Sequence, residues 1–297
     1  MMFVSGAADT FLLGVDGGGT QCRLRLRSGD GTLVGEASGG PSNIRFDPET
    51  VARSILAGCY AILDRAGLPR ETTSLIHAGF GLAGAAQTSA REQFLASRMP
   101  FRSISLDTDA YAAWLGAFGG ENGAILIVGT GSCGLSIVNG ERTYVGGWGA
   151  EISDEGSGLA IGREAIRRAL WAYDGRAAMT ALAETLLDGF GRNPEMIIDW
   201  ARSARPADFA RLAPLVFDYA SQRDALAVSL VEAAARDVAR IAERLLGAGA
   251  PRLCLMGGVA GALQPWLPPY VTDRVVPAAA DATEGAILMA CQAAANA

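Results

Sequence analysis

The sequence has little that would tie the protein to a metal cluster, a membrane or a nucleic acid. It holds one histidine, His77, and five scattered cysteines without a C-x-x-C pair, so a zinc site is not expected. No apolar run reaches the roughly 18 residues of a membrane span, and residues 1–9 do not resemble a secretory signal. The net charge is −6 and no basic block is present. We therefore expect a cytoplasmic protein with a small-molecule partner, no nucleic-acid partner and no membrane partner.

Apolar residues and glycines dominate what is present. Half of the 297 residues are apolar and 19% are charged, which is enough to bury a large core in one or two domains. The 38 glycines gather in short clusters after apolar runs. Such clusters are typical of turns where the backbone passes close to a ligand.

The start of the chain predicts an antiparallel meander of three strands. An apolar run at 11–15 is followed by the turn DGGGT at 16–20, the alternating segment CRLRLR at 22–27, a turn at 28–31 and a third strand at 32–37. The first hairpin turn of this meander is therefore rich in glycine.

The same order of signals returns near residue 124. The apolar strand AILIV precedes the glycine-rich turn GTGSCG, the strand LSIV, the turn NGER and the strand TYVGG. Leu24 and Leu26 correspond to Leu135 and Ile137, a constant shift of 111 residues. We interpret this as a repeated structural pattern that predicts two similar domains facing each other across a cleft.

Helical patterns alternate with the strands and place the chain in the α/β class. The domains predicted are 1–117 plus 281–297, and 118–280 with helical additions. Helices are expected at 47–67, 88–98, from 109 onward, 158–173, 177–190, 195–204, 207–220, 224–247 and 281–297, with further strands at 75–84, 103–107 and 251–258.

The two glycine-rich turns suit a nucleotide triphosphate. Each offers backbone N–H groups together with a hydroxyl, from Thr20 in one turn and from Thr130 and Ser132 in the other. Asp16 ends the first strand, where it could hold hydrated Mg²⁺, which prefers carboxylate and water ligands. The alternative is that both are ordinary tight turns. A P-loop motif is absent, and GFGLAG at 79–84 lacks the context of a dinucleotide-binding fingerprint.

In their order along the chain, these motifs resemble a known family. DGGGT, GTGS, GGWG followed by SDEGSG, and LMGG are similar to segments of the N-acetylglucosamine kinase and BadF-type branch of the sugar kinase/actin superfamily. GTGSCG, ISDEGSG, RLCLMG and DATEGAILMA resemble bacterial glucosamine kinases in particular. The resemblance runs from Gly14 to about Met289 and implies an actin-like ATPase (ribonuclease H-like) fold with ATP and Mg²⁺ as cofactors.

The resemblance also implies nucleotide-binding roles. Asp16 would position Mg²⁺. The remaining contacts would come from Gly18, Gly19 and Thr20 in the first phosphate loop, Thr130, Gly131 and Ser132 in the second, and Gly257 and Gly258 against adenosine.

Five residues match the sugar side of the family. Asn43, Trp148, Gly149 and Asp154 would contact the sugar, and Asp109 would contact it as the catalytic base. Three alternatives stay open: Asp107 or Asp109 only caps the helix that follows, Ser153 or Asp154 only caps a later helix, and Trp148 only packs. A base suits the chemistry, because a sugar hydroxyl must lose its proton when the phosphoryl group arrives.

The function implied is ATP-dependent phosphorylation of the 6-hydroxyl of glucosamine, giving glucosamine 6-phosphate. GGWG with Ala150 and Glu151 resembles the acetylglucosamine kinases, so N-acetylglucosamine kinase is the alternative. A further alternative is an ATPase that activates a partner redox enzyme through a shared iron–sulfur cluster, for which Cys133 lacks a matching second cysteine in a loop. A nucleotide-dependent sugar sensor or filament subunit ranks last. The resemblance leaves room for a homodimer.

Overall fold

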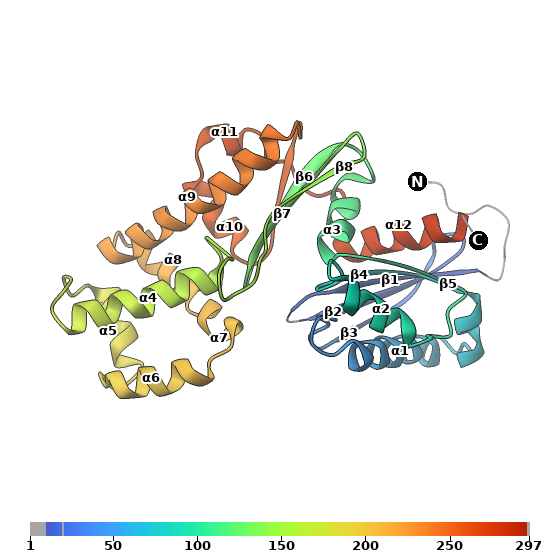
Figure 1. Ribbon diagram of the computed structural model, residues 1–297, viewed down its shortest axis with the longest axis horizontal. Coiled ribbons are helices and arrows are strands. Elements are labelled where there is room, and N and C mark those ends of the chain that lie inside the picture. The colour runs from blue at the N-terminus through green and yellow to red at the C-terminus, as the bar shows by residue number, and fades with distance from the viewer. Residues whose placement is uncertain (1–9, 20, 296–297) are drawn as a thin grey trace. The chain divides into compact units, whose positions relative to one another are not determined.

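The computed structural model describes residues 10–19 and 21–295 and divides into two compact units (Figure 1). Unit 1 comprises Met1–Glu121 and Pro277–Ala297, and unit 2 comprises Asn122–Val276. The chain thus crosses between the units at 121/122 and 276/277, whereas the sequence placed these boundaries after residues 117 and 280. Among the helices of the described residues, none combines the length and the apolar character that a membrane crossing requires.

Unit 1 is built on a five-stranded sheet in the order β3-β2-β1-β4-β5. The predicted meander is confirmed, because β1 pairs antiparallel with β2 and β2 with β3. β4 and β5 extend the sheet in parallel with β1. The strands are β1 Phe11–Gly17, β2 Cys22–Ser28, β3 Leu33–Gly39, β4 Ile76–Leu82 and β5 Ser103–Asp107.

Helices cover both faces of this sheet (Figure 1). On one face, Leu13, Val15 and Phe80 join apolar residues of α1 and α2 in a continuous core. On the other face lie α3 and α12, which also pack against each other. The elements are α1 Pro48–Arg65, the 3₁₀ helix η1 Arg70–Leu75, α2 Thr88–Ala96, α3 Asp109–Phe118 and α12 Ala282–Ala295.

Glycine allows α12 to approach the sheet and α3 closely. A Cβ atom at Gly79 on β4 would lie 2.0 Å from the carbonyl oxygen of Ala286, and one at Gly285 on α12 would lie 1.8 Å from that of Ala112. Real side chains do not tolerate these distances, so larger residues would force the layers apart. At its start α12 is capped by Asp281, whose carboxylate accepts from Glu284 N at 2.8 Å, as its sequence predicted.

Unit 2 repeats the meander and adds many helices. Its sheet has the order β8-β7-β6-β9, with β6–β7 and β7–β8 antiparallel and β6–β9 parallel. The strands are β6 Gly123–Val128, β7 Ser132–Val138, β8 Glu141–Gly146 and β9 Leu253–Met256. The helices are α4 Gly158–Tyr173, α5 Ala181–Asp188, α6 Pro194–Ser203, α7 Pro206–Ala210, α8 Ala213–Ser221, α9 Ala225–Gly247, α10 Ala260–Leu263, η2 Gln264–Trp266 and α11 Pro269–Thr272.

Predicted elements of unit 2 differ from the structure in their bounds, as at α5, which begins at Ala181 rather than at 177. The single helix expected at 207–220 is wrong: it is two helices that meet at Arg211–Leu212, because Pro214 lacks an N–H and its ring would clash with a preceding carbonyl. β7 begins at Ser132 rather than at 135, so the glycine-rich turn is shorter than its sequence suggested. The α/β class is confirmed, with one meander-based sheet in each unit.

Candidate active site

In unit 1, the candidate residues gather where the parallel strands end. Asp16 is paired in register with Gly81 of β4, and Gly81 with Asp107 of β5, so these positions form a row across the carboxyl edge of the sheet. Gly14, two residues before Asp16 on the same strand face, packs against α12. Asp16 therefore lies on the face that α3 and α12 cover. Ligands of open α/β sheets bind outside this edge.

Asp109 is the first residue of α3, immediately beyond that edge. It does not cap the helix, and neither does Asp107: the cap is Thr108, whose hydroxyl accepts from Tyr111 N at 3.1 Å. The carboxylate of Asp109 accepts from Ala110 N at 2.9 Å. Burial raises the pKa of Asp109 to about 6, and the charge of Asp16 contributes to the rise.

Asp16 is largely buried and has a cation beside it. Its side chain is 14% exposed, and its Oδ2 lies 3.2 Å from Nη2 of Arg23 on β2. Burial raises the pKa of Asp16, the guanidinium of Arg23 opposes the rise, and the charge of Asp281 adds to it. Asp16, Asp109 and Asp281 thus place three carboxylates close enough to influence one another electrostatically.

The loop that carries Asn43 is fastened to the ends of β1 and β4. Ser42 N donates to the carbonyl of Gly18 at 2.9 Å, and Ile44 N donates to that of Ala83 at 3.0 Å. The side-chain oxygen of Asn43 accepts from the backbone N of Arg45, also at 3.0 Å. Hydrogen bonds therefore connect the loop of Asn43 directly to the first glycine-rich turn.

The first glycine-rich turn leaves its backbone accessible. A Cβ atom at Gly19 would meet nothing within 4 Å, and one at Gly18 would meet only Gln21 O at 3.7 Å. A ligand can therefore approach this backbone without a side chain in the way. Thr20, also predicted to contact phosphate, lies outside the described residues.

In unit 2, the second glycine-rich turn is tied to the start of α4. Gly158 N donates to Gly129 O at 2.8 Å and Leu159 N to Thr130 O at 3.1 Å. The hydroxyl of Ser132 donates to Glu155 O at 2.7 Å. The segment SDEGSG is thereby held against the turn.

Asp154 lies against the same turn. Its Oδ1 accepts from Ser132 N at 3.4 Å, and a Cβ atom at Gly131 would lie 2.8 Å from its Oδ2, so a side chain at residue 131 would displace the Asp154 carboxylate. Burial raises the pKa of Asp154, the bond from Ser132 N lowers it, and the charges of Glu155 and Glu151 raise it. The helix-cap alternative for this segment is wrong, because the cap of α4 is Ser157 rather than Ser153 or Asp154.

Trp148 lies in a loop of unusual backbone conformation. Gly147 and Gly149 on either side of it have φ of +73° and +108°, values that residues with a side chain rarely adopt. The indole is 72% exposed. The alternative that Trp148 simply packs into the core is therefore wrong for this unit.

The glycines after β9 differ from each other. A Cβ atom at Gly257, whose φ is +96°, would lie 2.4 Å from Val128 O, so contact within the unit is sufficient to require glycine there. At Gly258 a Cβ atom would meet nothing within 4 Å, which leaves this backbone open to a ligand.

Comparison with known proteins identifies the family. The model of the BadF/BadG/BcrA/BcrD ATPase family matches residues 13–290. The chain belongs to this family. Since the family is one of ATPases, the chain uses ATP. The match covers both glycine-rich turns and every residue that the sequence singled out.

Two curated kinases are similar in sequence to this chain over more than half of their length. The glucosamine kinase GspK of Vibrio cholerae is 40% identical over 280 residues, which cover 94% of this chain and 95% of that protein. An N-acetylmuramic acid/N-acetylglucosamine kinase of Clostridium acetobutylicum is 34% identical over 60% of this chain and 59% of its own.

Solved structures agree with the fold. A Chromobacterium violaceum protein described as an N-acetylglucosamine kinase has a TM-score of 0.89 at 36% identity, covering 96% of this chain and all of that one. A ROK family glucokinase from Streptomyces griseus, solved with glucose and AMPPNP, has a TM-score of 0.51 at 18% identity, covering 96% and 99%, and shows the fold alone.

The sequence analysis did not predict a role for Arg23, which lies beside the candidate site. Arg23 is the ion-pair partner of Asp16, and the two are directly opposite each other in the β1–β2 ladder. The alternating segment CRLRLR contained a signal, since the hairpin register puts its first arginine on the strand face of Asp16.

Proposed function

We propose that the protein is an ATP-dependent sugar kinase that phosphorylates the 6-hydroxyl of glucosamine to give glucosamine 6-phosphate. The observation that carries the proposal is the match to a glucosamine kinase along nearly the whole of both chains. The proposal includes a cytoplasmic location and association as a homodimer.

Asp109 is the proposed catalytic base. It accepts the proton of the sugar hydroxyl when that oxygen attacks the γ-phosphoryl group. Support comes from its place at the carboxyl edge of the sheet, from Thr108 taking over the capping role, and from a pKa raised to about 6. A base with this pKa is ionised at neutral pH and is a stronger proton acceptor than an ordinary aspartate.

Asp16 and the glycine-rich turns are proposed to hold Mg²⁺ and the phosphates. The residues fit these ligands. Asp16 is a largely buried carboxylate, and burial and the charge of Asp281 raise its pKa. A divalent cation beside Asp16 would stabilise the charged carboxylate. Bound Mg²⁺ would neutralise phosphate charge. Gly18, Gly19, Thr20, Thr130, Gly131 and Ser132 are proposed to contact phosphate, and Gly257 and Gly258 to contact adenosine.

The sugar is proposed to contact Asn43, Trp148, Gly149 and Asp154 besides Asp109. Glu151, Asp154 and Glu155 lie together in one segment, and both glutamates act electrostatically on Asp154. A negative environment favours the cationic 2-amino group of glucosamine over a neutral acetamido group. This supports glucosamine as the substrate.

N-acetylglucosamine is the second candidate substrate, because relatives described as kinases of that sugar align with much of this chain. The redox-activator alternative has less support. Cys22, Cys59 and Cys254 are buried, and the two more accessible cysteines, Cys133 and Cys291, belong to different units.

A panel of sugars offered with Mg-ATP tests the proposal. We expect phosphorylation of glucosamine at the 6-position, read by ³¹P and ¹³C NMR of the product, with kcat/KM at least about tenfold above that for N-acetylglucosamine, since a desolvated charge interaction can supply this factor. Preference for N-acetylglucosamine would overturn the substrate assignment. No phosphorylation of any sugar would overturn the kinase itself.

The pH dependence of the reaction follows from the pKa of Asp109. Because this pKa is raised to about 6, the base becomes protonated as the pH falls through 6. We expect kcat/KM to fall by about tenfold per pH unit below about pH 6. ADP formation is measured by chromatography between pH 5 and 8. A rate unchanged down to pH 5 would contradict the role of Asp109.

A further inference from the structure

Arg23 is held opposite Asp16 by the β1–β2 ladder. The two residues are direct partners in the antiparallel register, so both side chains project from the same face of the sheet. Nη2 of Arg23 lies 3.2 Å from Oδ2 of Asp16. The pair is asymmetric: the Asp16 side chain is 14% exposed and the Arg23 side chain is 57% exposed.

The other arginines on this face of β2 are already engaged by acids of neighbouring elements. Arg25 pairs with Asp281 at 2.9 Å, Glu36 at 2.7 Å and Glu284 at 3.2 Å. Arg27 pairs with Glu284 at 3.0 Å. Within residues 10–19 and 21–295, Asp16 is the acid that pairs with Arg23, and Arg23 is the cation that pairs with Asp16.

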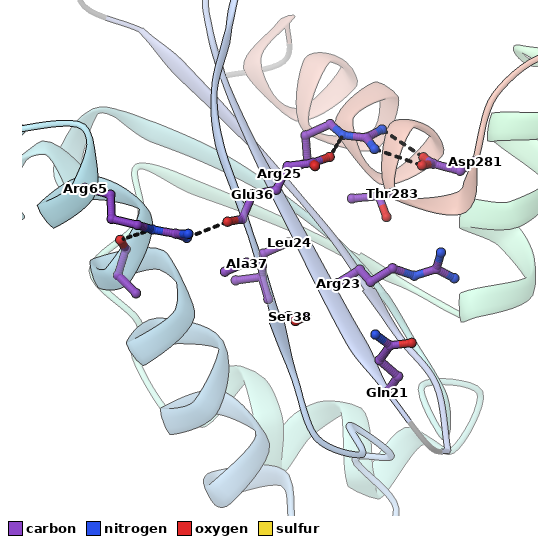
Figure 2. A pocket seen from close by; sticks show the side chains of 11 residues that line it. Gln21, Arg23, Leu24, Arg25, Glu36, Ala37, Ser38, Arg65, Asp281 and Thr283 are labelled. Atoms are coloured by element: carbon purple, nitrogen blue, oxygen red, sulfur yellow. Dashed lines mark hydrogen bonds and ion pairs between the residues drawn. The ribbon is translucent and has the colours of Figure 1, made fainter.

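Space is available beside Arg23. A pocket of about 640 Å³ is lined by Gln21, Arg23, Ser38, Asp281 and Thr283 among others. In Figure 2, the Arg25 side chain reaches Asp281 and Glu36. The Arg23 side chain lies apart from that of Arg25, and no dashed line joins it to another residue drawn there. With 57% of its side chain exposed and this pocket beside it, Arg23 has room to move away from Asp16.

We propose that Arg23 is a positioning residue that acts as the resident counter-ion of Asp16. It holds the carboxylate in place while no divalent cation is bound and gives up this contact when a cation binds there. The inference rests on the proposed role of Asp16 in metal binding. Its physical basis is that a guanidinium and a divalent cation beside one carboxylate repel each other.

The test is the binding of Mn²⁺ to the purified full-length protein, followed by the EPR signal of the unbound ion. Arg23→Gln removes the charge and retains hydrogen-bonding groups, so we expect it to bind Mn²⁺ about three- to tenfold more tightly than the parent protein. Arg23→Lys retains the charge and is expected to remain within about twofold of the parent. Arg27→Gln, four residues along the same strand, is the matched control and should leave the affinity unchanged.

The outcomes separate this inference from the proposed function. Tighter binding cannot arise from partial unfolding, so it would distinguish competition from a merely structural role. Unchanged or weaker binding by Arg23→Gln, with Asp16→Asn still abolishing binding, would overturn the role of Arg23 and leave the metal site intact. Unchanged binding by Asp16→Asn would overturn the metal site and, with it, the inference.

Discussion

Replacing Asp109 by Asn is expected to lower kcat by about 10²- to 10⁴-fold, the usual contribution of a positioned general base. The amide has nearly the same shape and its oxygen can still accept from Ala110 N, as the carboxylate does at 2.9 Å. It cannot take a proton from the sugar hydroxyl. The Kd of ATP and of the sugar should therefore change by less than about threefold, because the lost interaction belongs to the transition state.

Steady-state kinetics and calorimetric titration with both ligands measure this effect. Asp107→Asn is the matched control. Asp107 is the last residue of β5, two residues before Asp109. Its carboxylate accepts from Thr108 N at 2.8 Å, a bond that an amide oxygen can keep. The control should retain most of its activity. A kcat near that of the parent protein in the Asp109 variant would mean that another group removes the proton.

Replacing Gly285 by Ala is expected to lower the stability of unit 1 strongly. The added methyl carbon would lie 1.8 Å from Ala112 O and 2.5 Å from Gly116 N, both backbone atoms of α3. Backbone cannot rotate away as a side chain can, so α12 and α3 must separate. We expect the free energy of unfolding of unit 1 to fall by about 3 kcal/mol, at the upper end of the usual cost of overpacking.

Chemical denaturation followed by circular dichroism measures this change. Gly40→Ala is the control within unit 1, because a Cβ atom there would meet nothing within 4 Å and its φ is not in the left-handed region. Its stability should remain within about 0.5 kcal/mol of the parent. A Gly285→Ala protein as stable as the control would show that the α3–α12 contact is not tight in solution.

The strands and most helices followed from local sequence. Alternation in CRLRLR and apolar runs such as AILIV predicted β2 and β6, because the side-chain period of a strand is two. The one broken helix could have been predicted too, since Pro214 is visible in the sequence. Helical periodicity on both sides of it concealed the break.

Helix caps were harder to predict than helices. For α3 the candidates were Asp107 and Asp109, and for α4 they were Ser153 and Asp154, yet Thr108 and Ser157 are the caps. Several residues near such a start have a suitable side chain, and the residue at which the helical backbone begins decides which of them reaches the free N–H groups. For α12 Asp281 was correct, because Glu284 three residues later restricted the choice.

The amino-acid sequence by itself determined the two meanders, the α/β class, the order of the glycine-rich turns and the candidate carboxylates. Each of these depends on residue type and on spacing over a few positions. Only the tertiary structure decided the raised pKa of Asp109, the contact of Asp154 with Ser132 and the pairing of Arg23 with Asp16. These depend on burial and on distances between segments far apart in the chain, which strand register and helix packing set and local patterns do not encode.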